Sequence, residues 1–143
     1  MPKRIYLWAI LVGTIGCVLL GVAVSVALSG FSRILPIENV YGTYVASYPF
    51  GTDTIMLDRD GTFVQKVVVN DDPPPAVTKG HWEFDAKKSH VNFDRYLPID
   101  DRFGGLNKNW RTPNEGVAAV LPVEKLFFRI VMSSGANYPY FKQ

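Results

Sequence analysis

The stretch TDTIMLDRDGTFVQKVVV, from Thr52 to Val69, decides the fold of most of the chain. Both halves are rich in β-branched and apolar residues that alternate with polar ones, a pattern typical of half-buried β-strands. The residues between them, Asp58 to Gly61, have the composition of a tight turn, and Gly61 is able to adopt a positive φ. The stretch therefore predicts an antiparallel hairpin with strands at residues 52–57 and 62–69.

Similar segments lie on both sides of this hairpin, each short, rich in aromatic and β-branched residues, and bounded by Pro, Gly, Asn or Asp. We expect strands at residues 40–48, 52–57, 62–69, 78–84, 90–93, 116–123 and 124–132, with a last short one at 137–142. No helix is expected among them. The pattern predicts a mainly β domain over residues 40–143, a small antiparallel barrel or sandwich of seven or eight strands.

Three short patterns in the first half of this domain resemble the opening of small lipocalin-like bacterial β-barrels. They are Gly42-Thr43-Tyr44 (G-x-Y), Leu57-Asp58-Arg59-Asp60-Gly61-Thr62-Phe63 (L-x-x-D-G-T-F) and Gly80-His81-Trp82 (G-x-W). The resemblance implies an up-and-down antiparallel barrel. It also raises an alternative function, the binding of a small apolar ligand in a hollow lined by Tyr44, Phe63, Trp82, Phe84 and Phe93.

The other dominant feature is a run from Ile5 to Ser32 without a charged residue. A helix of about 20 apolar residues spans a bilayer, whereas the apolar core of a cleaved signal peptide has only about 7–15. We therefore expect a transmembrane helix at residues 5–32, with a cleaved signal as the alternative. Lys3 and Arg4 precede the run and only Arg33 closely follows it, which predicts cytoplasmic residues 1–4, a connector at 33–39 and an extracytoplasmic domain. A bacterial inner membrane with a periplasmic domain is the expected location.

Small residues occupy every fourth position of the uncharged run. They are Ala9, Gly13, Cys17, Gly21, Ser25 and Ser29. A step of four residues advances a helix by about 400°, so these positions form one slowly winding ridge. Small ridges let helices approach closely in lipid, where packing drives association. We expect this ridge to pack against a transmembrane helix of a partner subunit or of a second copy.

Composition excludes several function classes. Lys and Arg number 15 against 13 Asp and Glu, which leaves no basic field for nucleic acid. The single cysteine lies in the uncharged run, so no intrachain disulfide is expected. No nucleophile elbow or phosphate-binding glycine loop is present, so we expect no enzyme, no cofactor and no metal. His81, His90 and Asp94 leave a two-histidine, one-carboxylate metal site as a remote alternative.

The stretch from Leu97 to Pro113 has no periodicity, and loops of this length in compact domains are often functional. It carries residue types that dominate protein–protein interfaces. The candidate partner-binding residues are Arg102, Phe103, Trp110 and Arg111. In an equally weighted alternative, Phe103 and Trp110 fold back to close one end of the barrel.

These observations predict a non-enzymatic, single-pass accessory or structural subunit of a larger membrane complex. The expected partners are membrane lipid and transmembrane helices, with no nucleic acid. The alternative function is a membrane-tethered, lipocalin-like binding module for a small apolar ligand.

Overall fold

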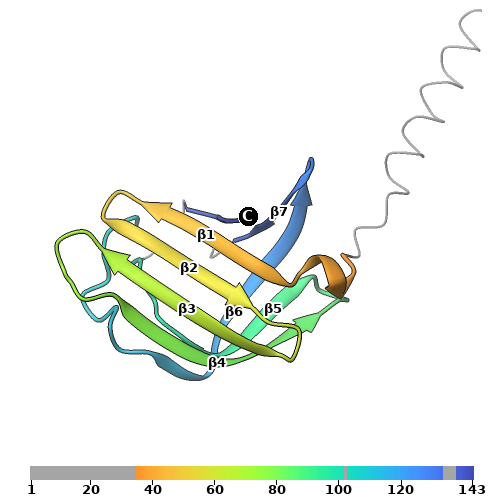
Figure 1. Cartoon of the computed structure of the whole chain (residues 1–143), viewed down its shortest axis with the longest axis horizontal. Coiled ribbons are helices and arrows are strands. Elements are labelled where there is room, and N and C mark those ends of the chain that lie inside the picture. The colour runs from red at the N-terminus through yellow and green to blue at the C-terminus, as the bar shows by residue number, and fades with distance from the viewer. Residues whose placement is uncertain (1–34, 102, 134–137) are drawn as a thin grey trace, which may run out of the picture. The chain divides into compact units, whose positions relative to one another are not determined.

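The computed structural model describes residues 35–101, 103–133 and 138–143. Within them, eight antiparallel strands form a closed barrel in which each strand pairs with the next and β8 pairs back to β1 (Figure 1). The elements are η1 (Ile37–Asn39), β1 (Gly42–Tyr48), β2 (Gly51–Leu57), β3 (Thr62–Val69), β4 (Ala76–Asp85), β5 (His90–Tyr96), β6 (Asn114–Leu126), β7 (Arg129–Met132) and β8 (Tyr140–Lys142). The mainly β prediction is confirmed, as a barrel and not a sandwich.

The expected transmembrane helix at residues 5–32, with its ridge of small residues, lies outside the described residues, as do residues 1–4 and Arg102. Among the residues that are described, no helix has the length and hydropathy needed to cross a bilayer. Residues Ile34–Gln143 form a compact unit separate from Met1–Arg33.

The predicted hairpin is present, with β3 at the predicted bounds and β2 one residue longer. Asp60 stabilises its turn by accepting hydrogen bonds from the Thr62 amide (2.9 Å) and hydroxyl (2.6 Å). The indole nitrogen of Trp82 donates to the carbonyl of Asp58 at 2.9 Å, so β4 is tied to the same turn. Gly80 is required nearby, because a Cβ there would lie 2.2 Å from a carboxylate oxygen of Asp94.

The predicted strand boundary between residues 123 and 124 is wrong. β6 continues through Pro122 to Leu126, and the chain reverses at Phe127 and Phe128, with Leu126 paired to Arg129. Phe127 adopts a φ of 54°, a left-handed conformation that is unusual for a bulky residue. The sequence does not indicate a turn at Phe127 and Phe128, because the segment contains none of the Gly, Asn, Asp or Pro residues that normally mark hairpins.

The interior of the barrel is filled by large side chains. Tyr44, Phe63, Phe93 and Tyr140 are each at most 1% exposed, and the rings of Phe63 and Phe93 meet edge-to-face at 4.9 Å between centroids. The hydroxyl of Tyr44 donates to the carbonyl of Val40 at 2.6 Å, which closes the barrel beside η1. Such interlocking aromatic contacts leave the core close-packed.

Alternating strand directions give the barrel two different ends (Figure 1). At the entry end the chain arrives through Leu35 and η1, and here lie the β2–β3, β4–β5 and β6–β7 turns. At the loop end lie the β1–β2 turn, the proline-rich β3–β4 loop and the long β5–β6 loop at residues 97–113. Leu35 is 6% exposed and belongs to the core, so the entry of the chain is fixed to the barrel.

Candidate functional site

Of the four predicted partner-binding residues, Phe103, Trp110 and Arg111 are described, and their side chains differ in exposure. Trp110 is 3% exposed and belongs to the core, as expected if it closes the loop end of the barrel. Phe103 is 92% exposed and stands away from that core. The backbone at Phe103 is held by Asp101, whose carboxylate accepts from the amides of Phe103 and Gly105 at 2.9 Å each. These hydrogen bonds lower the pKa of Asp101.

Arg111 clamps the long loop to the proline-rich β3–β4 loop. Its guanidinium donates to both carboxylate oxygens of Asp72 (2.9 and 3.1 Å) and to the carbonyls of Asp72 (2.6 Å) and Pro74 (3.0 Å). It also lies 4.4 Å from the centre of the Trp110 ring. The hydrogen bonds from Arg111 lower the pKa of Asp72. Arg111 is thus engaged within the protein, and most of its donors are used there.

A polar cluster that the sequence analysis missed lies inside the barrel. Asp53 and Gln65 are both 0% exposed, and the amide nitrogen of Gln65 donates to Oδ2 of Asp53 at 2.7 Å. The hydroxyl of Tyr140 donates to the same oxygen at 2.5 Å and lies 2.6 Å from the hydroxyl of Tyr96. Gln65 also bonds both backbone groups of Leu97. The cluster thus joins β2, β3, β5 and β8 through side chains.

Burial dominates the electrostatics of this cluster. Desolvation raises the pKa of Asp53 from 3.8 to about 7, although the hydrogen bonds from Tyr140 and Gln65 act in the opposite direction. Its second oxygen, Oδ1, has no hydrogen-bond partner among the residues that the structure describes. Burial likewise raises the pKa values of Tyr96 and Tyr140 well above 10. Because the carboxyl group is fully buried, no substrate reaches it in this conformation.

A sequence signal for the cluster exists in the strand alternation. On β2, Asp53 occupies an alternate position on the same inward face as the buried Ile55 and Leu57. On β3, Gln65 shares the inward face with Phe63 and Val67. Polar residues at inward positions of alternating strands are buried, and buried polar groups normally find partners. The partner Tyr140 lies on β8, too far along the chain for a local pattern to identify.

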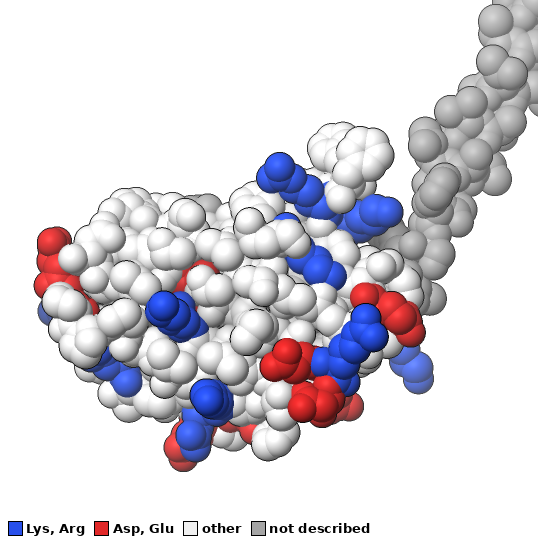
Figure 2. All heavy atoms as spheres, in the orientation of Figure 1, with Lys and Arg blue, Asp and Glu red and all other residues white. Residues whose placement is uncertain are grey.

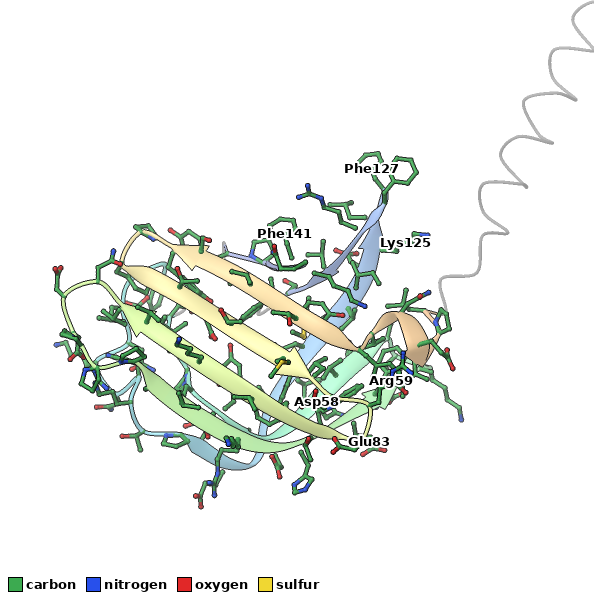
Figure 3. The ribbon with its side chains drawn as sticks, viewed as in Figure 1. Asp58, Arg59, Glu83, Lys125, Phe127 and Phe141 are labelled. Atoms are coloured by element: carbon green, nitrogen blue, oxygen red, sulfur yellow. The ribbon has the colours of Figure 1, made fainter. Side chains whose placement is uncertain are left out.

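The most exposed apolar site is the β6–β7 turn, which we name the aromatic tip: Leu126, Phe127 and Phe128, flanked by Lys125 and Arg129. Leu126, Phe127 and Phe128 are 51%, 85% and 97% exposed. Figure 3 shows Phe127 projecting from the end of the hairpin, and Figure 2 shows basic side chains beside the protruding rings. Two adjacent phenylalanines in water at a strained turn have a cost that burial against a partner would remove.

The histidines do not form a site. Nδ1 of His81 lies 3.1 Å from Oδ2 of Asp94 on the neighbouring strand, whereas His90 pairs with Asp85 and Pro122. His81 is largely exposed to solvent. Among the described residues, no group of three His, Cys, Asp or Glu side chains is close enough to hold a metal ion.

Comparison with known proteins identifies no relative of this chain. No protein-family model, no curated protein and no solved structure matches it. The closed eight-stranded antiparallel barrel is compatible with the architecture that the lipocalin-like resemblance implied, and the similarity extends no further than that architecture.

Proposed function

We propose that this chain is a single-pass membrane protein whose barrel acts as a non-enzymatic accessory or structural module of a larger membrane complex. The observation that carries the proposal is the contrast between the filled interior of the barrel and an exposed apolar site at one of its ends. Its interior is filled by its own side chains, whereas the end at which the chain enters the barrel exposes the aromatic tip. A barrel with a packed interior and an exposed apolar end is suited to docking against a partner and not to holding a ligand in a central cavity.

The filled interior argues against the alternative, a binding module for a small apolar ligand. Three of the five aromatic residues expected to line a hollow, Tyr44, Phe63 and Phe93, pack in the core at no more than 1% exposure. A hollow of about 750 Å³ lies at the loop end. Its lining is Pro98, Asp100, Asp101, Asn107, Asn109, Thr112 and Asn114. A mostly polar lining of this kind does not suit an apolar ligand.

The membrane part of the proposal rests on the sequence. The run from Ile5 to Ser32 has the length and composition of a membrane-spanning helix, and the basic residues before it favour a cytoplasmic N-terminus. The barrel then belongs on the extracytoplasmic side, with a bacterial periplasm as the expected compartment. The small-residue ridge through Gly13 and Gly21 supplies the proposed contact with a partner helix.

The test is purification of the tagged full chain from its native membrane in mild detergent, followed by mass spectrometry of co-eluting proteins. We expect stoichiometric membrane partners that are lost in the Gly13→Leu/Gly21→Leu variant. A matched control is Val12→Leu/Val22→Leu, which adds bulk beside the ridge. A chain that elutes alone would contradict the subunit proposal, and a chain that elutes with a small apolar molecule would support the binding alternative.

A further inference from the structure

We propose that the aromatic tip inserts into the headgroup region of the membrane that carries the chain, with Lys125 and Arg129 contacting anionic lipid headgroups. This inference rests on the proposed function, because it requires residues 5–32 to span that membrane. It adds a second membrane contact, made by the barrel itself.

The position of the tip in the fold provides the first argument. The chain enters the barrel at Leu35, and the β6–β7 turn lies at that same entry end because the strands alternate in direction. Only Arg33 and Ile34 separate Leu35 from the uncharged run. Since a residue spans at most about 3.5 Å, a bilayer that begins at Ser32 would lie within roughly 10 Å of Leu35. If residues 5–32 span the bilayer, this short connection keeps the entry end near the membrane surface.

The chemistry of the tip provides the second argument. Aromatic rings favour the interface between headgroups and acyl chains, and long basic side chains beside them extend to the lipid phosphates. Phe127 and Phe128 form the extreme end of the hairpin, where they are 85% and 97% exposed. Lys125 and Arg129 precede and follow the apolar residues on the two strands. This order, basic then apolar then basic, matches an anionic bilayer surface.

The charges of the entry end also indicate how the barrel meets the membrane. The acidic residues Asp58 and Glu83 lie at the same end but away from the tip, as Figure 3 shows. Arg59 lies beside Asp58 and offsets part of this acidity, so the tip, where two basic residues flank the apolar ones, is the side most attracted to anionic headgroups. The barrel is therefore expected to lean on the bilayer with its aromatic tip foremost.

Depth measurements on the full chain in lipid nanodiscs test this inference. In a Cys17→Ser background, Phe128→Cys carries an environment-sensitive nitrobenzoxadiazole dye, and Asp71→Cys, in the exposed β3–β4 loop at the opposite end, carries the same dye as a control. In phosphatidylglycerol-containing discs we expect a blue-shifted emission at position 128 and several-fold stronger quenching by spin-labelled lipid than at position 71. The additional change Lys125→Gln/Arg129→Gln should weaken that quenching in anionic discs and leave it unchanged in neutral ones.

Three outcomes would overturn the inference. Equal, water-like emission at both positions in a protein that has entered the nanodiscs would mean that the tip does not contact lipid. The proposed transmembrane helix at residues 5–32 would not be affected by that result. Blue-shifted emission without lipid quenching would mean that the tip is covered by protein, either a second copy or another partner. A chain that fails to enter nanodiscs would contradict the transmembrane helix of the proposed function. The lipid contact of the tip, which depends on that helix, would then be contradicted as well.

Discussion

Replacing Asp53 by Asn should change the way in which the stability of the barrel depends on pH. The carboxyl group is fully buried and its pKa is about 7 in the folded chain, against 3.8 when it is solvated. Between these values the folded state keeps a proton that the unfolded state releases. The free energy of unfolding therefore falls as pH rises through this window, and the loss is complete above pH 7.

The size of the effect follows from the shift. Each pKa unit corresponds to 1.36 kcal/mol, so a shift of about three units lowers the stability by up to about 4 kcal/mol between pH 4 and pH 8. That is a large share of the roughly 5–15 kcal/mol that stabilises an ordinary domain. Asparagine has nearly the same shape and cannot ionise, so this loss should be absent from the variant.

Asparagine carries a cost of its own. Its carbonyl can replace Oδ2 as the acceptor for Tyr140 and Gln65, but its NH2 group places two donors at the position of Oδ1, where the protonated carboxyl group has one, and no described residue accepts from that position. An unsatisfied buried donor costs about 1–3 kcal/mol. The variant should therefore be less stable than the wild type at pH 4 and more stable at pH 8, so that the two stability curves cross.

Urea unfolding of the full chain in detergent, followed by the fluorescence of the buried Trp82 and Trp110, measures both curves from pH 4 to pH 8. Asp71→Asn, in an exposed loop, is the control and should run parallel to the wild type. Parallel curves for the Asp53 variant and the wild type would refute the reasoning, because they would mean that Asp53 titrates alike in the folded and unfolded chains.

Three further predictions concern single side chains. Phe127→Gly should stabilise the barrel by up to about 1 kcal/mol in the same urea assay, because relief of the roughly 1–2 kcal/mol cost of a φ of 54° exceeds the roughly 0.5–1 kcal/mol entropic cost of glycine; a destabilised variant would show that the ring contributes packing. Trp110→Ala should cost about 3–5 kcal/mol, whereas Phe103→Ala should stay within about 0.5 kcal/mol; similar midpoints would contradict the assignment of Trp110 to the core. Arg111→Lys should speed proteolytic cleavage in the long loop several-fold, because a lysine cannot reproduce the paired contacts with Asp72; an unchanged rate would show that the clamp does not order the loop.

Local patterns predicted much of the barrel. The alternation in residues 52–69 and the turn at Asp58 to Gly61 gave a strand pair close to the one observed, because propensity, side-chain period and turn chemistry agree there. β5 was predicted too short, since it continues past an irregularity between Phe93 and Arg95. A strand that bends away from strict pairing loses the regular alternation on which such predictions depend.

Two features of the barrel, the aromatic tip and the buried carboxyl cluster, were not predicted. The aromatic tip was assigned to a strand interior, because a run such as Leu126 to Ile130 has strong strand propensity and no turn residue. The buried carboxyl cluster depends on Tyr140, which meets Asp53 only after the whole sheet has curled round to close. Both depend on contacts or conformations that a window of neighbouring residues does not encode.

Closure of the barrel has a consequence for its biogenesis. The first seven pairings each join strands adjacent along the chain, whereas the last joins Tyr44 to Lys142 and Val45 to Phe141. Loop-closure entropy makes this distant pairing the slow one, so the folding chain first forms an open sheet with two unpaired edges. Tyr140 lies on β8, the final strand. When β8 pairs with β1, the sheet loses its unpaired edges, and Asp53 on β2 gains its hydrogen bond from the hydroxyl of Tyr140 in the same step. Until then the nascent sheet is open to pairing with other copies through the bare edge of β1.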